Sequence, residues 1–321
     1  MGRVTIKDIA EAVGVTPSAV SLALRGSNRV SEATRKRVEE EAERLGYIRD
    51  LTGVLLRSTN PAIVGLACDF SQELHYCYYS NIQSRIEKAG GLLVTEDSRA
   101  SGMGKAIERL LQFRAGVVIA VNPEGLSDAK LKNIRVPVIT VGQVNLPGTS
   151  LVTSINSTGF DELAAHLAQR PGKLIHIEGP QGASATRRRE DLLSSLSKYG
   201  LECECVPGGS DVESGFLAAN SLIDAGIEDG TALLCYNDQC AEGALVALAR
   251  AGIKIPERVR VTGFDNAEVS QSKAFAITTI DRGAERIAEV SVELAMARIA
   301  DPKLAPERRE LETKLVLRET A

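Results

Sequence analysis

Two pairs of polar residues stand directly after apolar runs of the sequence and could hydrogen-bond a small molecule. Asn237 and Asp238 follow the run ALLCY, and Asp265 and Asn266 follow VRVTGF. If both runs are strands of one parallel sheet, the two pairs lie at the same edge and face a cleft. Asp238 also opens a helical pattern, so we expect it to cap that helix. Asn237 and Asp265 are then the candidates for contact with a ligand.

Patterns typical of catalysis or of metal binding are weak in this chain. SGMGKA, residues 101–106, lacks the glycine and lysine spacing of a phosphate-binding loop, and GPQGAS, residues 179–184, lacks the third glycine of a dinucleotide site. The three histidines are dispersed, and Cys203 and Cys205 form only a single Cys-x-Cys pair. We therefore expect no catalytic residue, no cofactor and no metal, and a sugar-modifying enzyme remains a minor alternative.

Composition limits the class of protein. The chain has 321 residues, of which 44% are apolar and 25% are charged, as in a globular protein of two or three domains. No stretch is apolar enough to be an export signal or a membrane span, so we expect a cytoplasmic protein with no membrane partner and with reduced cysteines. Residues 1–60 carry a net charge of +2 and the remainder a net charge of −6. A mildly basic start is compatible with a segment that binds nucleic acid.

Eight short apolar runs alternate with amphipathic helical patterns after residue 61. Strands separated by helices in this way indicate an α/β protein with parallel sheets. The series breaks near residues 150–159, which divides the strands between two sheets and predicts two lobes with a cleft between them. The runs are residues 63–69, 91–97, 115–121, 136–142, 173–179, 202–208, 231–238 and 258–265.

Three short helices are predicted at the start of the chain. Thr5, with an aspartate three residues later, is typical of a capping box. Thr16 is a good N-cap, Pro17 fits the first helical turn, and Gly26 fits the left-handed position after the helix end. Ser31 begins a third helix that Gly46 ends.

The first two helices and their short, glycine-containing turn match the helix-turn-helix pattern, in which the second helix enters the DNA major groove. That second helix needs to bury only three apolar side chains, so its other face is available to bases and phosphates. A small helical cap without a ligand is the alternative, but a basic cluster at residues 35–37 favours DNA. The candidate DNA-binding residues are Thr5, Thr16, Pro17, Ser18, Ser21, Leu22, Arg25 and Arg29.

The segment TIKDIAEAVGVTPSAVSLALRG, followed by RVSEATRKRVEEEAERLGY, resembles the head of the lac repressor/galactose repressor family of bacterial transcription regulators. VGLACD, CYNDQCAEGALVALARAGIKIPERVRVTGFDN and ITTIDRGAERIAEVSVELAMARI resemble parts of the body of that family. The resemblance implies a helix-turn-helix head followed by a two-lobed body like a periplasmic binding protein. It also implies a homodimer on a pseudo-palindromic operator, modulated by a small-molecule effector such as a sugar, a sugar acid or a nucleobase.

The resemblance also implies boundaries. The chain crosses between lobes near residues 155 and 281, and a last strand, residues 308–319, returns to the second lobe. The resulting domains are a DNA-binding head at 1–48, a hinge at 49–60, a first lobe at 61–155 and 282–304, and a second lobe at 156–281 and 305–321. A solute-binding protein would share this body but would have no use for the head.

Site residues follow from matching positions in the family. Those expected to contact the effector are Tyr78, Tyr79, Arg188, Asn237 and Asp265, and Leu56 matches a hinge leucine that wedges into the minor groove. The chain also departs from the family pattern at several positions. An arginine is replaced by Leu22, a glycine by Asp191, an aspartate by Ile155, and hinge residues by Arg49, Gly53 and Val54. We therefore expect a different operator sequence and a less helical hinge.

Overall fold

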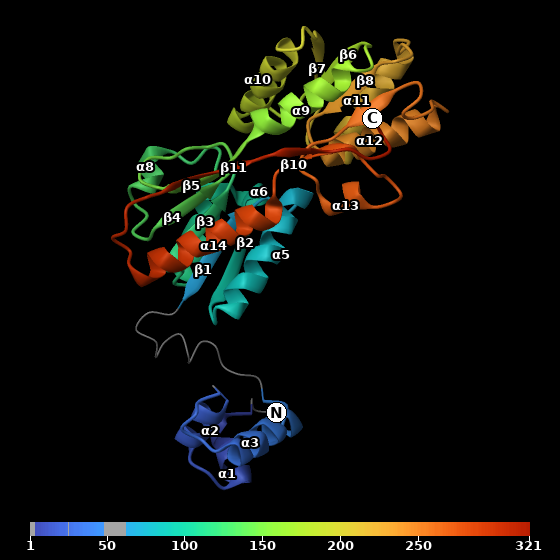
Figure 1. Cartoon of the computed structure of the whole chain (residues 1–321). Helices are drawn as coiled ribbons and strands as arrows, with labels where there is room; N and C mark the ends of the chain where they lie inside the picture. Colours follow the sequence, from blue (N-terminus) through green and yellow to red (C-terminus); the bar gives the residue numbers. More distant parts are fainter. Residues whose placement is uncertain (1–3, 25, 48–61) are drawn as a thin grey trace. The chain divides into compact units, whose positions relative to one another are not determined.

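The structure is a computed structural model that describes residues 4–24, 26–47 and 62–321. The chain forms two compact units, residues 1–61 and residues 62–321 (Figure 1). The hinge predicted at 49–60, which includes Leu56, lies outside the described residues, as does Arg25.

The first unit contains three helices with the predicted starts. The Thr5 backbone N–H donates to Oδ2 of Asp8 at 2.7 Å, and the Thr16 hydroxyl accepts from the N–H of Ala19 at 3.2 Å. The Ser31 hydroxyl likewise accepts from the N–H of residue 34 at 3.2 Å. These bonds satisfy N–H groups that the first helical turn leaves unpaired. The helices are α1 (Ile6–Val13), α2 (Pro17–Ala23) and α3 (Glu32–Arg44).

The core of this unit is small and takes side chains from all three helices. Its buried members are Ile9, Ala10, Val13, Val20, Ala23, Val38 and Ala42. Because so few groups are buried, each contributes a large share of the stability of the unit.

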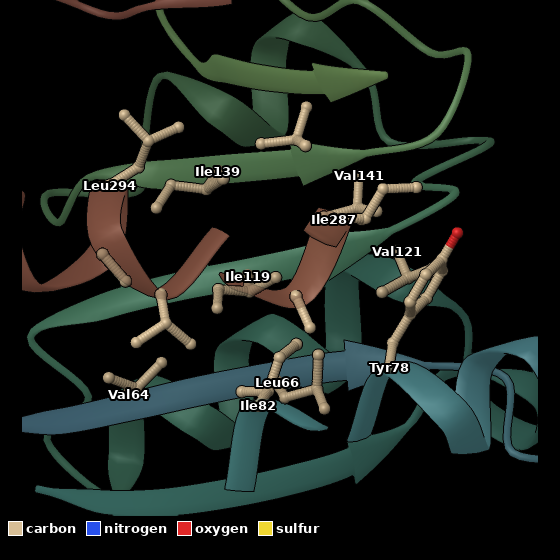
Figure 2. Packing of buried hydrophobic residues seen from close by; sticks show 14 of the residues in the cluster. Val64, Leu66, Tyr78, Ile82, Ile119, Val121, Ile139, Val141, Ile287 and Leu294 are labelled. Atoms are coloured by element: carbon tan, nitrogen blue, oxygen red, sulfur yellow. The ribbon is translucent and has the colours of Figure 1, made fainter. Parts of the chain in front are cut away.

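The first lobe of the second unit is a six-stranded sheet in the order β11-β5-β4-β3-β1-β2, with every pairing parallel. Helices α5 and α14 pack on one face of this sheet, where they and β1, β3 and β4 form the core (Figure 2). On the other face, Gly65 of β1 lies against Leu110 of α7. The elements are β1 (Ile63–Cys68), α5 (Glu73–Lys88), β2 (Leu92–Asp97), α6 (Ser98–Ser101), α7 (Met103–Gln112), β3 (Val117–Val121), α8 (Asp128–Leu131), β4 (Val138–Val141), β5 (Ser150–Ile155) and α14 (Ala284–Ala300).

The second lobe is a four-stranded parallel sheet in the order β7-β6-β8-β9. Alternate strand residues face α9 and α10 on one side of the sheet and α11 and α12 on the other. β6, β8 and β9 are buried along their whole length, and β8 accordingly reads as a continuous apolar run, whereas β7 at the edge of the sheet is half-buried with Glu204 exposed. The elements are α9 (Asn156–Ala168), β6 (Leu174–Ile177), α10 (Ala183–Ser197), β7 (Cys203–Val206), α11 (Val212–Asp224), β8 (Ala232–Cys235), α12 (Asp238–Arg250), β9 (Arg260–Thr262) and α13 (Glu268–Gln271).

The end of the chain differs from the prediction of one strand, residues 308–319, in the second lobe. The structure divides this segment into β11 (Arg308–Glu312), which pairs with β5 of the first lobe, and β12 (Lys314–Val316), which pairs antiparallel with β10 (Thr279–Asp281). Thr313 lies between them, and its hydroxyl donates to the carbonyl of Ile155 at 2.9 Å. An alternating strand fits the edge of either sheet, so the sequence pattern could not show this division.

No helix in the described part of the chain combines the length and the apolar character needed to cross a membrane.

Candidate functional site: a helix-turn-helix face and an inter-lobe cleft

Helix α2 separates a buried side from an accessible side. Val20 and Ala23 are fully buried against α1 and α3. The predicted DNA-binding residues lie on the accessible surface of the head wherever the structure describes them. Thr5, Thr16, Pro17, Ser18 and Arg29 are exposed, and Ser21 and Leu22 are half-buried.

Part of the basic cluster at residues 35–37 holds the head together. Nη2 of Arg37 donates to the carbonyl of Val13 at 2.8 Å, and Nη2 of Arg35 donates to the carbonyl of Ser27 at 3.2 Å. These two bonds connect α3 to the end of α1 and to the segment after α2. The sequence suggested only charge at these positions, because it does not show where a long side chain ends.

The body places polar side chains where the strand order of each sheet reverses. In the first sheet the reversal lies between β1 and β3, and in the second between β6 and β8. Ligands of open parallel sheets bind beyond the carboxyl ends of such strands. Gln72 and His75 follow β1, Arg188 lies on the helix after β6, and Asn237 follows β8.

A buried charge cluster connects the sequence-predicted residues Arg188 and Asp265. Nη2 of Arg188 lies 3.6 Å from Oδ1 of Asp265, and Nη1 of Arg282 lies 3.5 Å from the same oxygen. The three residues are 7%, 7% and 3% exposed, in the order Arg188, Asp265, Arg282. Nε of Arg282 also donates to the hydroxyl of Ser154, at the end of β5, at 3.1 Å. This cluster therefore spans both lobes.

Aromatic rings and backbone geometry hold this cluster in place. The Arg188 guanidinium lies between the rings of Tyr236 and Phe264, 4.2 Å and 4.0 Å from their centres, and donates to the carbonyl of Tyr236. Asp265 has a φ of 119°, a strained backbone conformation outside glycine. Its own N–H donates to the carbonyl of Ile280 at 2.9 Å, which fixes the carboxylate beside the arginines.

Asn237, and not Asp238 as expected from the sequence, caps the helix α12. Asn237 is the N-cap of α12, since its Oδ1 accepts from the N–H of Cys240 at 2.9 Å. Its Nδ2 donates across the cleft to Gln72 at 3.3 Å. Asp238 points inward and accepts from the N–H of Ala267 at 2.7 Å. Burial and the charge of Asp265 raise the pKa of Asp238 to about 7.

Asn266, the fourth polar residue after the strand ends, does not belong to this cluster. Its Oδ1 accepts from Nη2 of Arg318 at 2.6 Å, so it binds the last segment of the chain to the second lobe.

The two tyrosines on α5 occupy different environments. Tyr78 is 1% exposed within the first-lobe core, and burial raises its pKa to about 12. Its buried hydroxyl has no hydrogen-bond partner among the residues that the structure describes, and the charges of Arg282, Asp265 and Arg188 act on it. Figure 2 shows the ring beyond Val121 with its oxygen directed away from the apolar cluster.

Tyr79 is half-buried and lies in a separate group of rings. Its ring centre is 5.7 Å from that of Phe70 and 5.9 Å from that of Tyr76. Within the described part of the chain, no contact joins Tyr79 to Arg188, Asn237 or Asp265.

The lobes also contact each other at two further places. At one, the backbone N–H of Glu73 donates to Oε1 of Gln239 at 3.1 Å, and Gln239 donates to the carbonyl of Ser71. At the other, the N–H of Ser184, in the first turn of α10, donates to Oε1 of Glu124 at 2.9 Å. Relative movement of the lobes must break these bonds.

Sequence reasoning missed Arg282, Tyr236 and Ser154. Arg282 directly follows the strand TID, so the rule that selected Asn237 and Asp265, a polar residue just after a strand, would also have selected Arg282. Residue 155, where the family has an aspartate, is a half-buried isoleucine.

Ser154 and Asn156, the two neighbours of Ile155, make the polar contacts at this crossing between the lobes. Nδ2 of Asn156 donates to Oδ2 of Asp191 at 3.1 Å, and Ser154 receives the bond from Arg282. Asp191, the other departure from the family pattern in this region, therefore helps to fix the start of α9.

His75 is a buried residue with both ring nitrogens paired. Its Nδ1 donates to the carbonyl of Asp69 at 2.9 Å, and its Nε2 accepts from Nδ2 of Asn122 at 3.3 Å. Burial lowers the pKa of His75, which favours the neutral ring.

Comparison with known proteins agrees with both parts of this description. Residues 5–50 match the family described as bacterial regulatory proteins, lacI family, and residues 160–321 match the periplasmic binding protein-like domain. The chain is 26% identical to the "Probable HTH-type transcriptional repressor ExuR" of Bacillus subtilis (strain 168), covering 99% of this chain and 98% of the relative. It is 24% identical to the ribose operon repressor of Escherichia coli (strain K12), covering 99% of each.

Among solved structures, the lac repressor dimer bound to operator and the anti-inducer ONPF has the same fold. The TM-score is 0.79 at 24% identity, with 99% of each chain covered. The sequence of this chain is thus similar to that of known repressors, and its fold to that of the lac repressor, over almost its whole length. The chain therefore combines a helix-turn-helix head of the lacI family of bacterial regulatory proteins with a body that belongs to the periplasmic binding protein-like domain family.

Proposed function

We propose that this protein is a repressor that binds a pseudo-palindromic operator as a homodimer in the cytoplasm, and that a small molecule in the inter-lobe cleft changes its affinity for DNA. The observation that carries the proposal is the head, whose second helix buries Val20 and Ala23 while Pro17 and Ser18 stay exposed. The similar lac repressor structure is a dimer bound to operator, which supports the dimer and the operator here.

We assign the head to residues 1–48, the hinge to 49–60, and the lobes to the boundaries predicted above, corrected for β11. In this assignment α2 enters the major groove. Thr5, Thr16, Pro17, Ser18, Ser21, Leu22, Arg25 and Arg29 contact bases or phosphates, and Leu56 wedges into the minor groove at the operator centre.

The effector acts through the arrangement of the lobes. Arg188 and Asp265 come from the second lobe, whereas Tyr78 and Ser154 come from the first, and Arg282 bonds to both. A ligand between them favours one lobe arrangement over another. It shifts the equilibrium only by its difference in affinity for the two states, typically about 1–3 kcal/mol of coupling. We include Asn237 in this site, and Tyr79 as a residue of its first-lobe rim.

Operator binding is tested by selecting bound duplexes from a random library and titrating the selected duplex at several salt concentrations. Because bound phosphates release counterions, the logarithm of the affinity should fall linearly with the logarithm of the salt concentration, with a slope near −0.9 per phosphate contact. Selection of no sequence, together with binding of a sugar, would instead support a solute-binding protein. Turnover of the sugar would support an enzyme.

A pair of variants with equal charge change locates the DNA face. Ser18→Glu adds a negative charge on the exposed side of α2, and Arg44→Ser removes a positive charge at the far end of α3, where Arg44 pairs with Glu41. We expect Ser18→Glu to weaken operator binding at least about tenfold and Arg44→Ser to change it little. Equal losses would show that α2 does not face the DNA.

Leu22 tests how bases are recognised. Leucine offers apolar contact, for example to a thymine methyl, whereas Leu22→Arg can bond guanine with both guanidinium arms. The variant should change the preferred base at one position per half-site, by about 1–3 kcal/mol. An unchanged preference across the library would place Leu22 away from the bases.

A further inference from the structure

The buried cluster of Arg188, Asp265 and Arg282 between the two lobes carries more positive than negative charge. Arg188 and Arg282 both approach a single oxygen, Oδ1 of Asp265, at 3.6 Å and 3.5 Å. One carboxylate balances only one of the two guanidinium groups, and all three side chains are buried. A buried charge without a counter-charge costs free energy, so an anion beside the arginines would be stabilised there.

The neighbouring ionisable groups do not supply the second full negative charge. Burial, with the charge of Asp265, raises the pKa of Asp238 to about 7, and the same two causes raise the pKa of Glu73. Both carboxyls are therefore shifted toward the neutral form. The pKa of His75 is lowered by burial, so this ring adds no positive charge either.

Two hydrogen-bond donors beside the cluster have unused capacity. Arg282 uses Nε for Ser154 and Nη1 for Asp265, and within the described residues its Nη2 donates no hydrogen bond. In the described part of the chain, the buried Tyr78 hydroxyl has no hydrogen-bond partner, and its high pKa keeps it protonated as a donor. Among the described residues, Oδ2 of Asp265 accepts no hydrogen bond, so it is available to a hydroxyl of a ligand.

We propose that the cleft selects a monoanionic effector, a polyhydroxylated carboxylate such as a sugar acid, whose carboxylate is bound by Arg282, Arg188 and the Tyr78 hydroxyl. This inference rests on the proposed effector site and narrows its ligand from sugars, sugar acids and nucleobases to acids. Arginine suits the role because its planar guanidinium matches a carboxylate with two parallel hydrogen bonds. Asp265 binds the hydroxyl side of the same molecule and excludes a dianion by its own charge.

The first test compares acids with uncharged molecules of the same shape by isothermal titration of the full-length protein. The acids are D-glucuronate, D-galacturonate, D-gluconate and D-galactonate. The uncharged partners are the methyl esters of the two uronic acids and, for the open-chain gluconate and galactonate, the open-chain alcohols D-glucitol and galactitol. D-Glucose 6-phosphate represents a dianion. We expect at least one acid to bind about tenfold or more tightly than its uncharged partner, since a charge-assisted hydrogen bond supplies that much. Equal binding of uncharged partners, binding of the phosphate alone, or binding of no acid would overturn the proposal.

Variants of Arg282 give the second test. Arg282→Gln should lose about tenfold or more in affinity for the preferred acid while keeping its affinity for the uncharged partner, and Arg282→Lys should keep part of the preference. The control is Arg286→Gln in α14, the helix that begins two residues after Arg282; it loses the same charge from an exposed side chain paired with Glu289 at 2.6 Å. Thermal unfolding without ligand confirms that each variant is folded.

The operator titration separates this proposal from the proposed function. If the wild-type protein binds its selected duplex but shows no preference for acids, only the ligand class is wrong. If it prefers acids but selects no duplex, the repressor function is wrong and the charge argument stands. An Arg282→Gln variant that is folded and binds the acid as tightly as the wild type would also overturn the proposal.

Discussion

The head and the cleft pair their polar groups over different distances along the chain. The bonds that begin the helices of the head join residues three positions apart, such as Thr16 and Ala19. In the cleft, Arg282 bonds a residue 128 positions away, and Asn237 bonds one 165 positions away. Local pairing makes the head a preformed surface. The cleft exists only while two lobes hold a particular arrangement, so a ligand can change it.

Their carboxyl groups show the same contrast. In the exposed first turn of α1, hydrogen bonds from Thr5 lower the pKa of Asp8. In the body, burial raises the pKa of Asp238 and Glu242 above their ordinary range. Asp8 of the head therefore caps a helix in water, whereas Asp238 and Glu242 of the body lie where burial disfavours their charged form. Four changes, taken from the largest expected effect to the smallest, test this comparison.

Asp265→Asn should have the largest effect. It leaves two buried guanidinium groups without their carboxylate, while asparagine keeps the size and shape of the aspartate side chain. We expect the body to lose about 3 kcal/mol or more in free energy of unfolding, measured by urea denaturation, and the effector response to disappear.

The control for Asp265→Asn is Asp161→Asn. Asp161 pairs with Lys198 at 2.7 Å on the surface, so its loss should cost about 1 kcal/mol or less. Similar losses of stability in the two variants would mean that the buried guanidinium groups of Arg188 and Arg282 do not need the Asp265 carboxylate. The head transition should be unchanged in both.

Val20→Ala should come next and should affect only the head. Val20 is fully buried in a core of seven buried side chains, so removing two methyl groups should cost about 2 kcal/mol. Differential scanning calorimetry should show a lower unfolding temperature for residues 1–61. The unfolding temperature of the body should stay unchanged. A shift of both transitions together would contradict the independence of the two units.

Glu242→Gln tests the buried acids of the body. Burial, then Glu73 and then Asp238, raise the pKa of Glu242 from 4.5 to about 8. The stability that its proton contributes is fully present below pH 4.5 and is lost as the pH rises through about 8. The variant should therefore be more stable than the wild type at pH 8.5 and should lose less stability between pH 5 and 8.5. The effect is smaller than that of Asp265→Asn because the carboxyl can remain protonated.

If the free energies of unfolding of the Glu242→Gln variant and the wild type differ by the same amount at every pH in this range, the raised pKa of Glu242 is wrong. Glu285→Gln is the matched control, because Glu285 is exposed and pairs with Arg85 at 3.1 Å. Urea denaturation at each pH measures all three proteins.

Thr16→Ala should have the smallest effect, about 1 kcal/mol in the stability of the head, because it removes the bond from the N–H of Ala19. Thr16→Ser keeps the hydroxyl and should restore most of the loss. Hydrogen exchange of the α2 amides follows the change directly. If serine and alanine destabilise the head equally, the hydroxyl is not the source of the cap.

Much of the fold was predictable because its signals are local. The helix starts at Thr5, Thr16 and Ser31 depend on residues three positions apart, and all eight predicted strand runs form strands in the structure. The division of residues 308–319 between two sheets was not predictable. The partner strands, β5 and β10, decide it, and an alternating pattern fits either of them.

The sequence by itself determined the helix-turn-helix head, the parallel α/β body and the polar residues after two strands, because turns, caps and strand runs are encoded in neighbouring residues. Only the tertiary structure decided that Arg282 joins Arg188 at Asp265, that Asn237 rather than Asp238 caps α12, and that Arg35 and Arg37 brace the head. The arginine contacts depend on where a long side chain meets another segment of the chain, and Asp238 is not the cap because it accepts from the N–H of Ala267, 29 positions away. Such contacts are fixed by the packing of whole sheets and helices, and a short pattern of residues does not predict that packing.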